Sequence, residues 1–120
     1  MTIATDFAGK LQDKLNAQAA ADRASDHPYK RFATDYRFTV EPGRAYDRIV
    51  QENVNKDGQT GNRHVHAFVT KDGKLVKAAT WQAPQKGKDG LAVRFDLATP
   101  EGMAEAIEAA DFAGGYLYKH

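Results

Sequence analysis

The sequence contains no cysteine and no apolar run that approaches the roughly 20 residues needed to span a bilayer. The missing cysteine excludes disulfides, thiolate catalysis and cysteine-based zinc or iron–sulfur sites. The missing apolar run excludes a transmembrane helix. Residues 1–14 have no continuous apolar segment either, so we expect no cleaved signal peptide. Together these absences favour a cytoplasmic protein.

Established catalytic motifs are also missing. The sequence has no G-x-S-x-G, P-loop, G-x-G-x-x-G or H-E-x-x-H pattern. The segment Gly87–Gly90 is rich in glycine but too short to cradle a phosphate and open a helix. We therefore expect no catalytic activity, no cofactor and no bound metal. An enzyme or metal protein that uses His64 and His66 stays open as an alternative.

The 120 residues have an ordinary globular composition, with 42% apolar and 28% charged residues. The net charge is only +1, but it is unevenly placed: residues 29–97 carry thirteen basic and eight acidic side chains, whereas both ends are net acidic. A basic middle suggests an anionic partner. A solvated surface of mixed charge explains the same numbers.

The N-terminal segment predicts a helix from Thr5 to about Ala24. Phe7, Leu11 and Leu15 recur at four-residue spacing, which marks a narrow apolar stripe. We expect Thr5 or Asp6 to cap its start, and the segment 25–28 to end it because Pro28 disfavours helix at His27. A helix with such a narrow stripe could pack on the body of the protein, dock on a partner, or fray. We treat 1–28 as a helix with its linker and 29–120 as a single α+β domain.

The middle of the chain predicts strands. Candidates are 37–40, 45–54, 63–70, 74–81 and 91–97, with turns at Pro42–Gly43 and Asp72–Gly73 and loops over 55–62 and 84–90. The alternation in 91–97 places Leu91, Val93, Phe95 and Leu97 on one face. A short terminal strand is expected at 116–118.

A second helix is expected from Thr99 to Phe112. Thr99 supplies a hydroxyl cap, Pro100 suits the first helical position, and Gly114–Gly115 provides a stop. The fold class is therefore α+β: an antiparallel sheet of four to five strands, with the C-terminal helix packed on one face and an N-terminal helix. The predicted core consists of Ile49, Val65, Ala67, Val69, Val76, Ala78, Val93, Phe95, Met103 and Ile107.

The Asp72–Gly73 dipeptide is a strong signal for a two-residue hairpin loop. With Lys71 opposite Lys74, one face of the strand pair would hold Val69 opposite Val76, Ala67 opposite Ala78 and Val65 opposite Thr80. The other face would hold Phe68 opposite Lys77, His66 opposite Ala79 and His64 opposite Trp81. Arg48 or Tyr46 of the neighbouring strand could join this second face.

That second face carries two competing hypotheses. Bases would stack on Trp81, Phe68 or His64 while lysines hold phosphates, each stacked base contributing about 1–3 kcal/mol. Alternatively, Trp81 and Phe68 form a second core under the N-terminal helix. The candidate nucleic-acid-binding residues are Trp81, Phe68, Lys77, His64, His66, Arg48, Lys86 and Lys88.

The two histidines at 64 and 66 are a candidate metal-binding pair. On a strand His64 and His66 would share a face about 7 Å apart, which suits a metal ion. Zinc usually takes three or four protein ligands, and no third is evident on that face. We therefore expect one histidine to make hydrogen bonds and the other to stack on Trp81.

Three segments in the same order carry a family resemblance. They are Gly43–Val50 (GRAYDRIV), Arg63–Val69 (RHVHAFV) and Val76–Gly87 (VKAATWQAPQKG), followed by an ending ADFAGGYLY at 110–118. Over about 36–118 they resemble a group of small uncharacterised bacteriophage proteins. His64 departs from the serine usual in that group, and Phe112 from its tryptophan. The resemblance implies a phage-encoded protein acting in the host cytoplasm or carried in the virion, and it transfers no activity.

Two functions from different classes follow. We favour a small accessory protein that binds nucleic acid through the basic and aromatic sheet face. The alternative is a protein-binding module, either a virion component or an inhibitor of a host protein, that docks through Phe7, Leu11 and Leu15.

Overall fold

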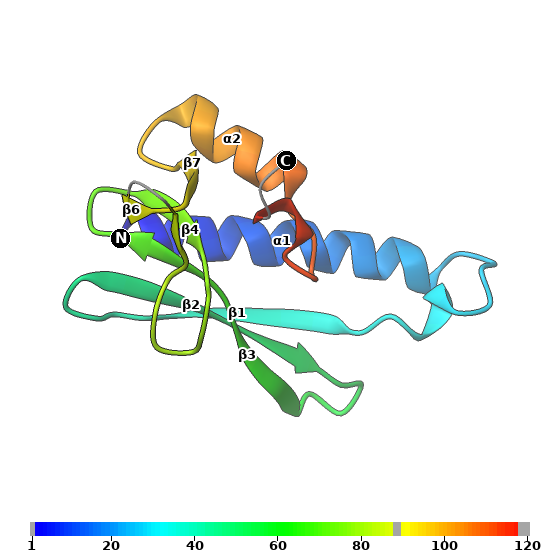
Figure 1. Ribbon diagram of the computed structural model, residues 1–120. Helices are drawn as coiled ribbons and strands as arrows, with labels where there is room; N and C mark the ends of the chain where they lie inside the picture. The colour runs from blue at the N-terminus through cyan, green and yellow to red at the C-terminus, as the bar shows by residue number, and fades with distance from the viewer. Residues whose placement is uncertain (1, 88–89, 118–120) are drawn as a thin grey trace.

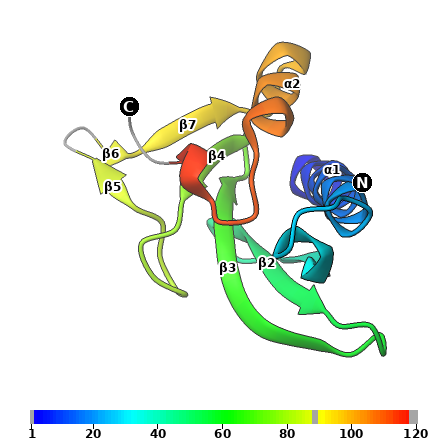
Figure 2. The same cartoon turned by 90° about the vertical axis from the view of Figure 1, so that its right-hand side faces the viewer.

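The fold is α+β, as predicted, with two helices on the same side of a five-stranded antiparallel sheet (Figure 1, Figure 2). The computed structural model describes residues 2–87 and 90–117. Sheet neighbours follow the order β1-β2-β3-β4-β7, and β5 with β6 forms a separate two-stranded ribbon. The elements are α1 (Ile3–Arg23), η1 (Lys30–Phe32), β1 (Asp35–Glu41), β2 (Tyr46–Val54), β3 (Thr60–Thr70), β4 (Lys74–Lys77), β5 (Lys86–Gly87), β6 (Gly90–Leu91), β7 (Val93–Asp96), α2 (Pro100–Ala109) and η2 (Gly115–Leu117).

Helix α1 belongs to the central core. Phe7, Leu11 and Leu15 are at most 2% exposed and pack in one cluster with the inner face of the sheet and with α2. The predicted stripe is therefore real, and it packs on the body of the protein. Docking on a partner through these three side chains is wrong for this fold because they are not accessible. The α1 helix and the sheet share one hydrophobic core.

The start of α1 differs from the prediction. The N-cap is Thr2, whose Oγ1 accepts from the backbone N–H of Thr5 at 3.1 Å, so neither Thr5 nor Asp6 caps the helix. The helix begins two residues earlier because Ile3 packs against the core as well. A hydroxyl at the N-cap pairs a backbone donor that the helix leaves free.

Polar side chains of α1 also cover the edge of the sheet. The side-chain amide of Asn16 donates to the carbonyl of Tyr36 at 3.0 Å and accepts from its N–H at 2.7 Å. The Oε1 atom of Gln12 accepts from the N–H of Phe38 at 2.9 Å. These bonds occupy backbone groups of edge strand β1 that would otherwise be open to another strand.

The hairpin between β3 and β4 has a different register from the predicted one. Val69 pairs with Leu75, Phe68 with Val76 and Ala67 with Lys77, a shift of one residue. The loop contains three residues rather than two, because Gly73 adopts a φ of +93° and Lys74 donates its N–H to Thr70 Oγ1. None of the six predicted cross-strand pairs forms. Since side chains alternate, the shift moves Val76 onto the face of Phe68.

The returning strand is also shorter than predicted, since β4 ends at Lys77 rather than Trp81. Ala78 pairs only in an isolated bridge with Pro84, and residues 79–83 fold back in a turn. Thr80 Oγ1 accepts from the N–H groups of Gln82 and Ala83, which stabilises this turn. Trp81 therefore lies in a loop and not on a strand.

Strand β3 begins at Thr60, so the predicted loop over 55–62 is shorter than expected. The predicted strand 91–97 divides into β6 and β7 at Ala92, whose N–H donates to the carbonyl of Gln85. The change of direction leaves Val93 44% exposed, so its place in the predicted core is wrong.

Helix α2 begins as predicted, with Thr99 Oγ1 accepting from the N–H of Gly102 at 2.9 Å. It ends at Ala109 rather than Phe112, and Gly114–Gly115 does not stop it. At this end of α2, the ammonium of Lys14 on α1 donates hydrogen bonds to the backbone carbonyls of Ile107, Glu108 and Ala110 at 2.5–3.0 Å. A cation suits the negative end of a helix. The expected terminal strand is instead the 3-10 turn η2, and Tyr118 lies outside the described residues.

The predicted core is partly confirmed. Five of its residues are buried: Ile49, Ala67, Val69, Val76 and Met103. Four are only partly buried: Val65, Ala78, Phe95 and Ile107. Within the described part of the chain, no helix is long and apolar enough to cross a membrane.

Candidate binding surface on the outer face of the sheet

The face of the sheet that points away from α1 and α2, called the outer face below, gathers arginines and glutamates beside the only tryptophan. Glu41 on β1 stands opposite Arg48 on β2, and Arg48 stands opposite Phe68 on β3. Antiparallel pairing places such partners on one face. The buried inner cluster contains Ile49, Ala67 and Val69 but not their neighbours on this face.

Trp81 contacts two guanidinium groups. The guanidinium carbons of Arg48 and Arg63 lie 5.1 and 4.8 Å from the centroid of the Trp81 ring. The Nε atom of Arg48 also donates to the backbone carbonyl of Trp81 at 2.8 Å, which fixes the 79–83 turn against β2. The tryptophan remains 39% exposed. The face of an indole ring carries partial negative charge, so it attracts a cation placed over it.

Both arginines are held by carboxylates. Glu41 pairs with Arg48 at 3.1 Å and with Arg63 through its second oxygen. Glu52 lies 3.9 Å from the Nε atom of Arg63. The two arginines and two glutamates balance in charge, and exposed Arg37, which stands opposite Glu52, adds one positive charge to the outer face.

Phe68 does not offer a stacking surface, contrary to the prediction. It is 2% exposed: the guanidinium carbon of Arg48 lies 5.7 Å from its ring centroid, and the Tyr46 ring packs against it at a steep angle with 6.2 Å between the ring centroids. Together with buried Val50 and Val76 it forms a small apolar layer on the outer face. Phe68 is buried, as the second-core alternative expects, but it lies under Arg48 and Tyr46 on the outer face and not under the N-terminal helix. That alternative is wrong for Trp81, which is 39% exposed and contacts the arginines of the outer face.

The histidines lie apart from this cluster. His66 is buried among Phe38, Gln51 and Tyr116, on the inner side of the sheet. The cause is a register shift between Ile49 and Val50, which leaves His66 as an extra residue on β3. Its expected position opposite Ala79, on the same face as Trp81, is therefore wrong.

His66 makes hydrogen bonds with both ring nitrogens, as expected for one of the pair. Nδ1 lies 2.9 Å from Gln51 Oε1 and Nε2 lies 2.7 Å from the Tyr116 hydroxyl, so neither nitrogen is left to bind a metal. Burial lowers the pKa of His66 to about 4, and nearby His64 lowers it too. No group of three or more metal-ligating side chains occurs among the described residues.

The remaining candidates are scattered. His64 is exposed, and its Nδ1 lies 3.1 Å from the carbonyl of Asn62; arginines, not His64, contact the Trp81 ring. Lys77 pairs with Ala67 of the inner face instead of Phe68. Lys86 is exposed on the separate β5–β6 ribbon, and Lys88 lies outside the described residues.

The sequence analysis missed Arg63, Glu41 and Glu52. In an unbroken strand Arg63 would share a face with Ala67 and Val69. The extra residue at His66 reverses that alternation and turns Arg63 toward Trp81. A bulge in the middle of a strand leaves no local mark that periodicity reveals.

A family model described as a family of unknown function (DUF7717) matches residues 2–119, and the chain therefore belongs to this family. The matched range includes α1, in agreement with the packing of that helix in the core. Neither a curated protein nor a solved structure matches.

Proposed function

We propose that this member of the DUF7717 family is a small accessory protein without catalytic activity that binds single-stranded nucleic acid on the outer face. The observation that carries the proposal is a partly exposed indole in contact with two guanidinium groups. The likeness to small bacteriophage proteins supports a phage-encoded protein that acts in the host cytoplasm.

In this proposal Trp81 contacts the bases, and the arginines contact the phosphate backbone. The open part of the Trp81 ring supplies a stacking surface, which accepts any base and contributes about 1–3 kcal/mol. Arg48 and Arg63 supply donors to phosphate oxygens, and exposed Arg37 extends the positive charge along the sheet. Stacking of this kind requires an unpaired base, which favours single strands over duplex.

The carboxylates set the strength and the salt dependence of binding. A phosphate must take the place of Glu41 or Glu52 at the guanidinium of Arg63, whose side chain is 45% exposed. Exposed ion pairs contribute at most about 1 kcal/mol, so a phosphate can replace them. With so few contacts we expect weak affinity that falls as salt rises.

The test uses Trp81 as its own reporter, since it is the only tryptophan. Oligothymidine is titrated into the protein while indole fluorescence is followed, at salt concentrations from about 50 to about 200 mM. We expect quenching at low salt that is lost at high salt. Absence of quenching at low salt, or quenching insensitive to salt, would count against the proposal.

Variants localise the site by anisotropy of a labelled oligonucleotide. Arg63→Gln should weaken binding several-fold and reduce the salt slope by about 1. Lys30→Gln, which removes the same charge from exposed η1, is the matched control and should bind as the parent does. Equal weakening by both variants would indicate a diffuse charge effect rather than this site.

A second candidate function is a protein-binding module, such as a virion component or an inhibitor of a host protein. The surface that favours it is not the buried stripe of α1 but an apolar groove on the helical side of the molecule.

A further inference from the structure

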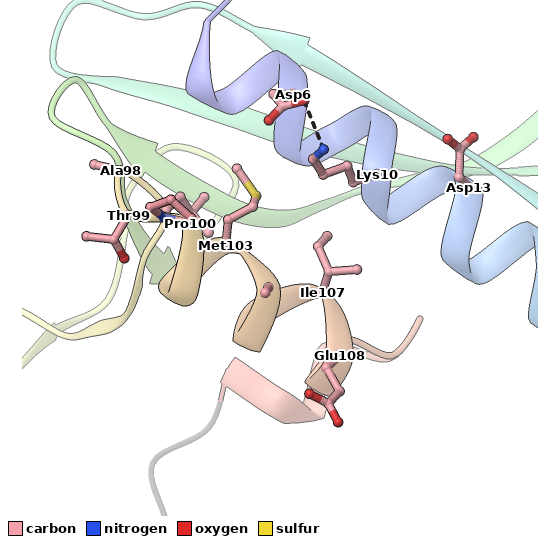
Figure 3. Close-up of a pocket in the computed structure, with 11 residues that line it drawn as sticks. Asp6, Lys10, Asp13, Ala98, Thr99, Pro100, Met103, Ile107 and Glu108 are labelled. Carbon is pink, nitrogen blue, oxygen red and sulfur yellow. Dashed lines mark ion pairs between the residues drawn. The ribbon is translucent and has the colours of Figure 1, made fainter.

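A groove of about 790 Å³ runs between α1 and α2 (Figure 3). Its apolar surface comes from Pro100, Met103 and Ile107 of α2, and Leu97, which directly follows β7, lies buried at its floor. Asp6, Lys10 and Asp13 of α1 form the facing wall. Small, exposed Ala104 leaves the groove open to solvent.

The rim of this groove is acidic. Lys10 is paired with Asp6 at 3.5 Å, so its charge is already balanced. Asp13 and Glu108 line the groove and have no ion-pair partner in the part of the chain that the structure describes. Helix α2 carries three glutamates and no basic residue. An approaching cationic side chain would therefore meet unpaired carboxylates on both walls.

The shape suits a helix. Met103 and Ile107 are four residues apart, so they lie one above the other on the same face of α2 and form an apolar ridge (Figure 3). A third helix can lay its own ridge into the space between two neighbouring helices. Helix-in-groove recognition uses apolar anchors at this spacing, with charged residues on either side.

Charge also argues against a second copy of this chain as the occupant. In a two-fold dimer the same patch faces itself, so Asp13 and Glu108 would meet like charges. Like-charge pairs across an interface are unfavourable. The unpaired carboxylates instead fit a partner of opposite sign.

We propose that the groove between α1 and α2 binds a basic amphipathic helix of a partner protein. Apolar side chains of that helix contact Pro100, Ile107 and the accessible part of Met103, and its lysines or arginines pair with Asp13 and Glu108. This site is separate from the outer face, so it stands whether or not the protein binds nucleic acid.

The probe is a fluorescein-labelled synthetic helix with leucine at i, i+3, i+4 and i+7 positions and lysine at the remaining ones. Its matched control carries glutamate in place of every lysine. We expect the full-length protein to bind the lysine peptide with micromolar affinity and the glutamate peptide at least ten-fold more weakly, because complementary charge selects between them.

Two groove variants and one remote variant test the location. Ala104→Arg fills the groove at an exposed helical position, and the double variant Asp13→Lys/Glu108→Lys reverses the rim charge. Each should weaken the lysine peptide at least ten-fold. Asp26→Lys/Asp57→Lys makes the same change of charge at exposed loop positions outside the groove and should leave affinity within about two-fold, since salt screens distant charges. Circular dichroism confirms that each variant is folded.

Methyl NMR of Met103 and Ile107 supplies a second readout, in which both signals should shift on adding the lysine peptide. The proposal is overturned if the two peptides bind equally, if the remote variant weakens binding as much as the rim variant, or if Arg63→Gln weakens binding as much as Ala104→Arg. Concentration-dependent dimerisation that Ala104→Arg abolishes would also overturn it, by making a second copy the occupant.

Discussion

The imidazole of His66 and the phenol of Tyr116 share a hydrogen bond of 2.7 Å that joins β3 to the C-terminal turn η2. The other ring nitrogen of His66 faces the amide oxygen of Gln51, which can only accept. Nδ1 therefore carries the proton, and Nε2 accepts from the Tyr116 hydroxyl. The neutral imidazole satisfies two buried polar groups at once, the Gln51 amide oxygen and the Tyr116 hydroxyl, and a charged imidazole would leave the phenol without an acceptor for its proton.

The free energy of unfolding should therefore fall as the pH drops below the pKa of an ordinary histidine. Burial lowers the pKa of His66 to about 4, nearby His64 lowers it as well, and Asp111 opposes the shift. In the unfolded chain the pKa is about 6.5, so the unfolded state binds more protons between these values. The contribution is complete above pH 6.5 and decreases as the pH falls toward 4, by about 3 kcal/mol in total.

Urea unfolding at a series of pH values checks this expectation, with His66→Gln as the variant that lacks the titrating group. The difference in free energy of unfolding between parent and variant should shrink as the pH falls. NMR titration of the His66 ring gives a direct value that needs no variant. A ring that titrates near 6.5 would contradict the prediction.

Tyr116→Phe should destabilise the protein although it keeps the ring. The change removes the O–H that His66 Nε2 accepts from and leaves a buried nitrogen without a partner, at a cost of about 1–3 kcal/mol. Tyr29→Phe is the matched control, because Tyr29 is 81% exposed and should change stability by less than about 0.5 kcal/mol. Equal stability of the two variants in urea unfolding would show that the buried bond contributes nothing.

Leu11→Ala should destabilise the protein by about 2–5 kcal/mol, since it opens a cavity at a fully buried position between α1 and the sheet. Gln18→Ala on the exposed side of the same helix should stay within about 0.5 kcal/mol. Deletion of residues 1–28 should unfold the sheet, as monitored by near-UV circular dichroism. A shortened chain that keeps its tertiary signal would mean that α1 is only an accessory element.

Two glycines in helices should respond to alanine in opposite ways. A Cβ atom on Gly9 has no heavy atom within 4 Å, so Gly9→Ala should stabilise α1 by about 0.5–1 kcal/mol through helix propensity. A Cβ on Gly102 would overlap the carbonyl oxygen of Asp96, so Gly102→Ala should lower the melting temperature despite the same gain in propensity. Thermal unfolding of the pair decides the matter, and stabilisation by Gly102→Ala would show that the start of α2 can shift to relieve the overlap.

The elements that the sequence predicts well are those with a local signal. Residues Phe7, Leu11 and Leu15 mark α1 by their spacing, and the cap and proline at 99–100 mark the start of α2. The Asp72–Gly73 turn is likewise a local matter and lies where expected. Turn chemistry and helix caps involve neighbours in the chain, so a single sequence carries them.

Pairing across strands is less accessible to sequence. An Asp–Gly pair fits both a two-residue loop and the observed three-residue loop, and the difference moves every side chain of β4 to the other face. The position of His66 depends on an extra residue in β3 relative to β2. This irregularity belongs to the pairing of two strands and not to either strand alone. The first shift places Val76 opposite Phe68, and the second buries His66 and turns Arg63 toward Trp81.

By itself the sequence determined the class of fold, the two helices, the turns and the absence of cysteine chemistry, because periodicity, capping and composition are local properties. The tertiary structure alone decided the register of β3 and β4, the packing of α1 in the core, the contact of Trp81 with Arg48 and Arg63, and the acidic groove beside α2. Each of these depends on which residues far apart in the chain bury surface together, and only the folded chain brings them into contact.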